Sequence, residues 1–235
     1  MSERYASLWA VVPVKEIGRS KQRLSAALFS DERERLVRAM LRDVLVALRA
    51  ASGLADVLVI TRDGEVGALA KECGAQVLAE RGAGDLNAAL RQAAAHLVAA
   101  GAPGLLVVPA DVPAVRPDDI STLAREHGPS PAVTLVSDRR GVGTNALAAS
   151  PPDLCPFLFG EDSFERHLAA AREAGVEPRV FDARGLRYDV DVEHDLDEIA
   201  LQSPGPETSD LLRRFGRVVA PARRNELATS SEERL

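Results

Sequence analysis

Short apolar runs alternate with helix-like segments along most of the chain, and this alternation restricts its fold more than any other feature. The apolar runs predict strands at residues 8–14, 56–61, 75–80, 105–111, 132–137, 145–150, 178–183 and 186–192. Apolar residues at helical spacing predict helices at residues 30–51, 65–73, 86–100, 117–126, 163–174 and 194–201. We therefore predict an α/β chain with three layers, in which helices cover both faces of a mostly parallel mixed sheet.

The character of the chain changes near residue 203. We interpret residues 1–202 as one large domain and residues 203–235 as a C-terminal extension. The extension begins with the linker-like SPGPETS, and residues 208–219 could form one short helix. Its end, residues 221–235, has little apolar content, which predicts disorder.

Composition excludes several classes of function. A net charge of −6 and 46% hydrophobic residues are typical of an ordinary globular protein without a general affinity for nucleic acid or membrane surfaces. No apolar run approaches the roughly 20 residues that span a bilayer, and the first residues lack a signal pattern. Cys73 and Cys155 fit neither a disulfide framework nor a zinc motif. These features predict a cytoplasmic protein.

A cluster of cations follows the first predicted strand. It contains Lys15 and Lys21, two of only three lysines in the chain, together with Arg19 and Arg23. Ligands of open α/β sheets bind at the carboxyl ends of the strands, so the cluster indicates an anionic substrate, with phosphates favoured. The alternative interpretation is a solvated, charged loop.

Three acidic residues are candidates for metal ligands. Asp111 follows the apolar run 105–108, while Asp189 and Asp191 alternate along a predicted strand and so share one face. Together they would form an oxygen site suited to Mg²⁺ and substrate phosphates. Alternatively, Asp111 caps a turn, and the other two acids face water on an edge strand. Asp195 and Asp197 are interpreted as surface residues.

Three further segments could approach a ligand closely. They are GAGDLNAAL (82–90), GVGTNAL (141–147) and FGEDSF (159–164). The first and third enter predicted helices, whose N–H groups favour anions. A plain hairpin and an ordinary capped helix are the competing explanations for the second and third. Neither the P-loop nor the Rossmann fingerprint is present. No serine–histidine–acid arrangement stands out, and the four histidines are interpreted as structural or exposed.

Seven short motifs occur in a fixed order along the chain. They are VPVK (12–15), KQRL (21–24), LNAA (86–89), PADVP (109–113), GTNAL (143–147), FGEDSF (159–164) and DVD (189–191). Over about residues 8–201 the chain thereby resembles the CofC/FbiD guanylyltransferases of deazaflavin (coenzyme F420) biosynthesis. Related molybdopterin and sugar nucleotidyltransferases have a Gly-rich loop and an Arg-Met pair after the first strand. This chain has Val-Lys-Glu-Ile-Gly there.

The resemblance implies a MobA-like nucleotidyltransferase fold and a reaction. GMP is transferred from GTP to a small phosphorylated acid with release of pyrophosphate. The acid is phosphoenolpyruvate in bacterial members, 2-phospho-L-lactate in archaeal ones and 3-phosphoglycerate in some proteobacteria. The Arg-rich, Ala-rich composition is typical of a bacterium with high genomic GC content. The resemblance then implies phosphoenolpyruvate as the acceptor, which would give enolpyruvoyl-2-diphospho-5'-guanosine.

Residue roles follow from the same resemblance. It implies that Asp111, Asp189 and Asp191 bind Mg²⁺ and that Thr144, Gly160 and Ser163 bind the phosphorylated acid. Lys15, Lys21 and Arg23 would contact the triphosphate. The nucleotide would lie near Gly82, Gly84, Asn87 and Pro109.

Several alternatives stay open at this point. The chain could be a nucleotidyltransferase with another base or acceptor, or a non-catalytic nucleotide-binding protein. The sequence decides neither the acceptor nor the number of metal ions. A homodimer, and hand-over of the product to the next enzyme of the pathway through the extension, are further possibilities.

Overall fold

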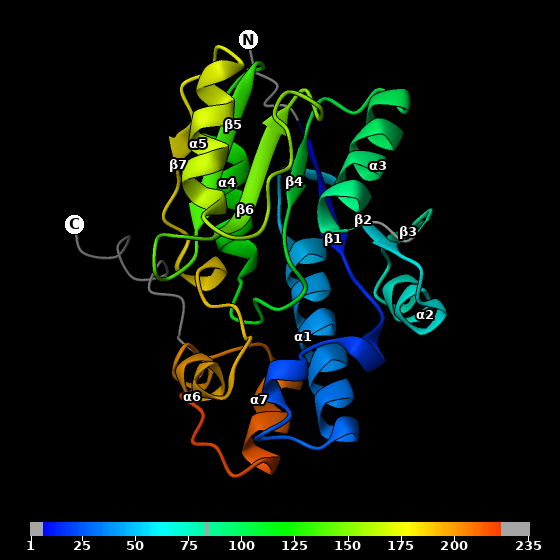
Figure 1. Ribbon diagram of the computed structural model, residues 1–235, viewed down its shortest axis with the longest axis vertical. Coiled ribbons are helices and arrows are strands. Elements are labelled where there is room, and N and C mark those ends of the chain that lie inside the picture. Colours follow the sequence, from blue (N-terminus) through cyan, green and yellow to red (C-terminus); the bar gives the residue numbers. More distant parts are fainter. Residues whose placement is uncertain (1–6, 83–84, 222–235) are drawn as a thin grey trace, which may run out of the picture.

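Seven strands form one mixed sheet in the order β3-β2-β1-β4-β6-β5-β7 in the computed structural model, which describes residues 7–82 and 85–221 (Figure 1). They are β1 (Leu8–Pro13), β2 (Leu54–Thr61), β3 (Gln76–Ala79), β4 (Leu105–Val107), β5 (Ala132–Ser137), β6 (Thr144–Ser150) and β7 (Arg179–Val180). Strand β1 pairs in parallel with β2 and β4, β2 with β3, and β5 with β7. Strand β6 is antiparallel to both β4 and β5. The predicted three-layer mixed sheet is confirmed.

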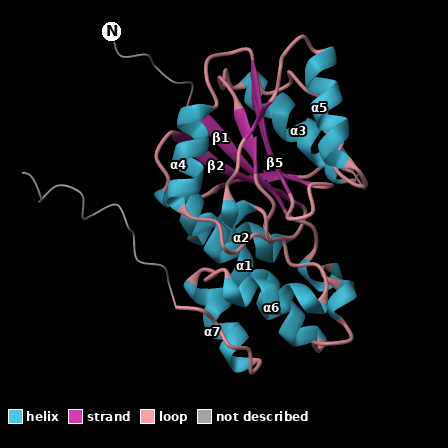
Figure 2. Cartoon of the chain, turned by 90° about the vertical axis from the view of Figure 1, so that its left-hand side faces the viewer, coloured by secondary structure: helices cyan, strands magenta, loops and turns pink. Residues whose placement is uncertain are grey.

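Helices cover both faces of this sheet (Figure 2). They are α1 (Ser30–Ala50), α2 (Gly64–Glu72), α3 (Leu86–Ala99), α4 (Pro117–Glu126), α5 (Ser163–Glu173), α6 (Glu193–Leu201) and α7 (Pro206–Arg214). Helices α3 and α5 bury their apolar residues in one core cluster, and the other five helices pack in the cluster on the opposite face. Within the described residues, no helix is both long enough and apolar enough to cross a membrane.

Two predicted strands end earlier than the apolar pattern indicates. The strand expected at 105–111 is only β4, because two prolines follow and proline has no N–H for a ladder. The strand expected at 178–183 is reduced to the two residues of β7.

The predicted strand at 186–192 is wrong. A short 3-10 helix (Arg184–Leu186) is followed by irregular backbone up to α6. The backbone N–H groups there have other partners: Val190 donates to the carbonyl of Asp111, and Asp191 and Val192 donate to the carboxylate of Asp195. These N–H groups are therefore occupied outside the sheet.

Helix α7 packs against α1 and places Leu211 and Leu212 in the main core. Its N-terminus is capped by a residue far away in the sequence. Asp43 of α1 is only 5% exposed, and its carboxylate accepts hydrogen bonds from the N–H groups of Glu207 (3.1 Å) and Thr208 (2.8 Å). The described part of the extension thus shares the core, while the disorder predicted for its end concerns residues 222–235, which lie outside the described residues.

We expect Asp43→Ala to lower the free energy of unfolding by about 1–3 kcal/mol, because one buried and one partly buried N–H group lose their acceptor. Urea denaturation of the full chain measures this change. The control is Asp31→Ala, since Asp31 is an exposed acid on the same helix. Equal stability of the two variants would show that the Asp43 cap contributes nothing.

Candidate active site

The loop after β1 is held in place at both ends. The N–H of Ile17 donates to the carboxylate of Asp63 at 3.0 Å, and Ile17 and Leu24 are buried. Between them, Lys21 adopts the left-handed conformation with φ of 55°. A non-glycine residue in this region stores strain, which is typical of functional sites.

Lys21 lies between two of the predicted acids. Its Nζ donates to Asp111 and, at 2.7 Å, to Oδ1 of Asp191, and its side chain is only 11% exposed. Burial alone would lower the pKa of Lys21, but the charges and hydrogen bonds of the two acids outweigh it and raise this pKa. The ammonium group therefore stays charged and occupies the space between the carboxylates.

Backbone contacts bring these two acids together across a long sequence separation. Val190 N–H donates to the carbonyl of Asp111 at 3.1 Å, which joins the two segments. One carboxylate oxygen of Asp195 accepts from the N–H groups of Asp191 and Val192, both at 2.8 Å, and Arg139 pairs with the other oxygen. Asp195 is buried, so its interpretation as a surface residue is wrong: it fixes the backbone of Asp191.

Asp189 is linked to the same cluster by Asn145, which lies at a β-bulge in β6. Val136 pairs with Ala146, but Ser137 pairs with Thr144, so Asn145 is an extra residue in β6. Its side chain is re-aimed and donates to Oδ1 of Asp189 at 3.1 Å.

The pKa of Asp189 is raised, first by burial and then by the negative charges of Asp111 and Asp191, against the hydrogen bond from Asn145. Burial alone would raise the pKa of Asp191. The positive charges of Lys21, Arg23 and Arg140 outweigh burial and lower this pKa. Asp189 therefore lies close enough to Asp111 and Asp191 for their charges to raise its pKa.

Over residues 7–82 and 85–221, no three acidic, histidine or cysteine side chains are arranged so that they could hold a metal ion by themselves. The acids around Lys21 nevertheless offer the all-oxygen donors that Mg²⁺ prefers. Mg²⁺ is commonly held by one or two carboxylates and completed by substrate phosphates and water. The residues fit such a substrate-completed site rather than a cage made by the protein alone.

The other two predicted cations differ in their surroundings. Arg23 is exposed but close enough for its charge to lower the pKa of Asp191, as does the charge of Arg140. Lys15 is exposed in the loop directly after β1. Arg23 and Arg140 thus lie near Asp191, while the contact of Lys15 with a triphosphate stays a prediction.

Thr144 and Ser163 lie side by side at the start of β6 and α5. The N–H of Thr144 donates to Oγ of Ser163 at 2.9 Å, and both residues are buried. Gly160 is exposed and has a φ of 131°, which a side chain would strain. Helix α5 begins without a side-chain cap, and the N–H of Phe164 in its first turn donates to the carbonyl of Val142 at 3.0 Å.

The residues predicted to bind the nucleotide lie in several separate segments. Asn87, at the start of α3, uses its amide to bind the backbone of Phe159 through two hydrogen bonds of 2.9 and 3.0 Å. It therefore ties the turn before α3 to the loop before α5. Gly82 and Pro109 lie in exposed and half-buried loop positions, whereas Gly84 lies outside the described residues.

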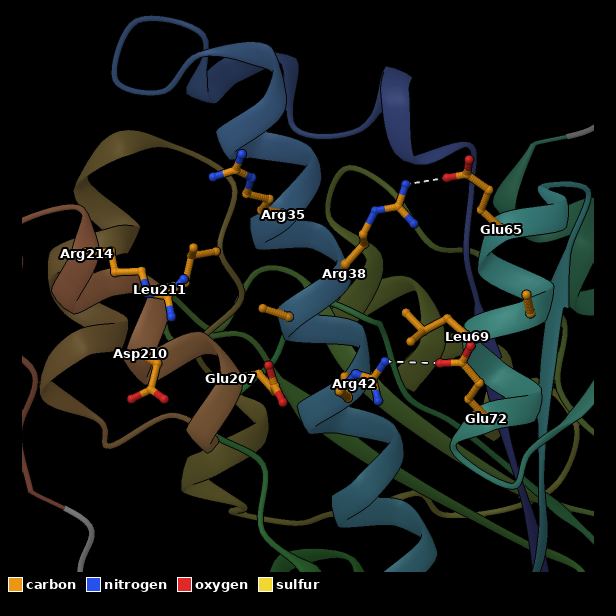
Figure 3. Close-up of a pocket in the computed structure, with 12 residues that line it drawn as sticks. Arg35, Arg38, Arg42, Glu65, Leu69, Glu72, Glu207, Asp210, Leu211 and Arg214 are labelled. Atoms are coloured by element: carbon orange, nitrogen blue, oxygen red, sulfur yellow. Dashed lines mark hydrogen bonds and ion pairs between the residues drawn. The ribbon is translucent and has the colours of Figure 1, made fainter.

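A groove of about 530 Å³ lies elsewhere, between α1, α2 and α7 (Figure 3). Four arginines and four acids line it, and Arg38 and Arg42 pair with Glu65 and Glu72. These charges cancel, so the groove offers little attraction for a polyanion, and no predicted site residue lines it.

Two of the four histidines are buried, and His127 provides a pH-dependent prediction. Its ring nitrogens contact Thr134 and Ser150 at 2.9 and 3.0 Å, and burial, followed by the charge of Arg179, lowers its pKa from 6.5 to about 4. Because the folded-state pKa is the lower one, its stabilising contribution is complete above pH 6.5 and is lost as the pH falls toward about 4.

We expect the stability of wild type relative to His127→Gln to fall by about 3 kcal/mol between pH 7.5 and 4.5. Urea unfolding of both proteins at the two pH values measures this shift. A constant difference in stability would contradict a neutral, buried His127.

Comparison with known proteins shows the family to which the chain is related. A family model described as "Guanylyl transferase CofC like" matches residues 8–233 and so continues past residue 201, where the resemblance was expected to end. A phosphoenolpyruvate guanylyltransferase of Sphaerobacter thermophilus is 40% identical over 86% of this chain and 96% of its own. A 2-phospho-L-lactate guanylyltransferase of Methanothermobacter thermautotrophicus is 37% identical over 91% and 93%.

A solved nucleotidyl transferase from Methanothermobacter thermautotrophicus has a TM-score of 0.59 at 20% identity, covering 88% of this chain and 99% of its own. This likeness supports the fold alone. The family match and the two guanylyltransferases extend over most of the sequence. The chain therefore belongs to the CofC-like guanylyl transferase family.

Proposed function

We propose that the protein transfers GMP from GTP to phosphoenolpyruvate, with release of pyrophosphate and Mg²⁺ as cofactor. The product would be enolpyruvoyl-2-diphospho-5'-guanosine, an intermediate for coenzyme F420. The proposal is supported by family membership and by relatives named for this activity. A cytoplasmic location is part of the proposal and accords with free thiols at Cys73 and Cys155.

A contact in the site supports the proposal in addition to family membership. Lys21 is held between Asp111 and Asp191, and Asp189 lies close enough for their charges to raise its pKa. Both substrates are polyanions, so the main obstacle is to bring their phosphates together. Alternating positive and negative groups suit this task, because the acids can hold a cation and the basic side chains can meet phosphate oxygens.

Asp111, Asp189 and Asp191 would hold Mg²⁺ together with the substrate phosphates. When bound, the ion supplies charge neutralisation and a bridge between phosphate oxygens. Lys21 and Arg23 would then contact the triphosphate and stabilise the negative charge on the departing pyrophosphate.

The acceptor needs no base from the protein. A phosphate monoester has a second pKa near ~6 and is therefore largely dianionic at neutral pH. Its oxygen can attack the α-phosphorus of GTP directly, while the bond from that phosphorus to the pyrophosphate oxygen breaks. The two buried histidines are accordingly not required for proton transfer.

Thr144, Gly160 and Ser163 would bind the acid at the start of α5. The candidate acids differ by a double bond, a methyl or a hydroxyl group, and such differences are discriminated by pocket shape. Because one relative is named for 2-phospho-L-lactate, that acid and 3-phosphoglycerate are the alternatives to phosphoenolpyruvate. Homodimer formation and hand-over to a following enzyme stay predictions.

The test is a mass-spectrometric assay in which the protein receives GTP, Mg²⁺ and an equal mixture of the three acids. We expect guanylylated phosphoenolpyruvate as the main product, with stoichiometric pyrophosphate, and much less product when CTP or ATP replaces GTP. A different main product would reassign the acceptor or the base. Nucleotide binding without pyrophosphate release would favour a non-catalytic binding protein.

A further inference from the structure

The buried His167 of α5 is fixed in one neutral tautomer. Its ring is fully buried, and Nε2 accepts a hydrogen bond from the backbone N–H of Leu158 at 2.9 Å. A backbone N–H can only donate, so Nε2 carries no proton and the neutral ring has its proton on Nδ1. Burial, followed by the charge of Arg166, lowers the pKa of His167 to about 4, which keeps the ring neutral near pH 7.

This tautomer determines the direction of the neighbouring hydrogen bonds. Nδ1 of His167 lies 2.9 Å from Oγ1 of Thr144, so Thr144 accepts in this contact and its own hydroxyl proton remains for another acceptor. The carbonyl of Ser163 also interacts with the ring, and sharing the Nδ1 proton with it leaves the tautomer unchanged. Oγ of Ser163 already accepts from the N–H of Thr144, so its proton too remains for another acceptor.

We propose that His167 is a positioning residue that makes the Thr144 hydroxyl a donor aimed at the phosphorylated acid, beside the Ser163 hydroxyl that accepts from the N–H of Thr144. This inference rests on the proposed function. His167 would not touch the substrate or transfer a proton. It would act through Thr144 and through the backbone that precedes Gly160.

The same ring also holds the loop before α5. Besides its bond to Leu158, it packs edge-on against Phe159, with ring centroids 4.9 Å apart. The backbone of Phe159 is bound by Asn87 from α3. His167 and Asn87 thereby fix Leu158 and Phe159 from two sides, which sets the position of Gly160 at the mouth of the site.

Two substitutions separate the functions of the two ring nitrogens. His167→Asn places an amide donor near the position of Nδ1, which retains the bond to Thr144. His167→Gln places an oxygen near the position of Nε2, which retains the bond to Leu158 and loses the one to Thr144. We expect His167→Gln to raise the KM for phosphoenolpyruvate about tenfold, as for loss of one oriented hydrogen bond, and to leave the KM for GTP within about twofold.

For His167→Asn we expect the KM for phosphoenolpyruvate to stay within about threefold of wild type. The matched control is His127→Gln, because His127 is equally buried and makes two hydrogen bonds to residues outside the site. That control should change stability without changing either KM. A purely structural role of His167 would make the two glutamine variants behave alike.

A measurement on wild type keeps the test independent of whether the variants fold. Histidine ¹⁵N NMR distinguishes a protonated from an unprotonated ring nitrogen, and we expect protonated Nδ1 and unprotonated Nε2 for His167. The opposite tautomer would overturn the inference, as would an unchanged KM for phosphoenolpyruvate in a folded His167→Gln. Absence of any guanylylated product from wild type would instead reject the proposed function.

Discussion

Asp189→Asn is expected to lower kcat by about 10²-fold or more, the range seen when one electrostatic stabiliser is removed from an active site. Asparagine has nearly the same shape as aspartate, and its oxygen can still accept from Asn145, which donates to Asp189 at 3.1 Å. The substitution therefore removes a charge and changes little of the packing. Any large loss of turnover reports on the electrostatics of the site.

Pyrophosphate release with saturating GTP and phosphoenolpyruvate measures this loss. The control is Asp182→Asn, an exposed acid of the preceding segment whose carboxylate pairs with Arg187 at 3.2 Å. It should retain the wild-type rate. Near-wild-type turnover of Asp189→Asn at limiting Mg²⁺ would remove Asp189 from the proposed metal site.

Lys21→Met is expected to have a similarly large effect, a decrease in kcat of about 10²-fold or more. Methionine fills much of the same space without the charge, so Asp111 and Asp191 would face each other with no cation between them. The charge that meets the leaving pyrophosphate would also be lost. Lys21→Arg should recover part of the rate, since it restores the charge with a different geometry.

The third lysine of the chain supplies the control. Lys71 is exposed on α2, far along the chain from the acids, and Lys71→Met should leave kcat unchanged. Equal activity of Lys21→Met and Lys71→Met would show that the contacts of Lys21 are incidental. An intact thermal unfolding transition of Lys21→Met would show that the loss is not one of folding.

The sequence was sufficient for the architecture because strand and helix periodicity dominate in the first two thirds of the chain. The buried strands from Leu8 to Ser150 and the caps at Asp63 and Asp85 are local signals that the tertiary structure leaves intact. The last third was less predictable. There the alternation of 186–192 resembles a strand, but its backbone N–H groups bond to Asp111 and Asp195 instead.

The acidic residues of the candidate site also depend on long-range contacts that local sequence signals do not reveal. Asp189 and Asp191 converge with Asp111 although they do not lie on a strand, because backbone hydrogen bonds, rather than strand alternation, bring them together. The bulge that re-aims Asn145 depends on the register between β5 and β6, which no local pattern encodes. Asp195 follows the N-cap residue Val192 by three positions, a spacing that could have indicated that its carboxylate accepts from the N-cap N–H.

His167 was missed for another reason. A lone histidine on an amphipathic helix is most simply read as structural, and nothing in the sequence shows that its ring lies against Thr144 and Leu158. The spacing of four residues from Ser163 places both on one helix face. That signal becomes informative only once Ser163 is itself a candidate ligand of the acid.

We propose that distant acids and Lys21 form one Mg²⁺-dependent centre for joining two phosphates. The most direct test is the Mg²⁺ concentration that gives half-maximal pyrophosphate release in wild type and Asp189→Asn. We predict no turnover of wild type in excess EDTA, and at least a tenfold higher Mg²⁺ requirement in the variant. Turnover of wild type without divalent ions, or the same Mg²⁺ requirement in both proteins, would contradict the claim.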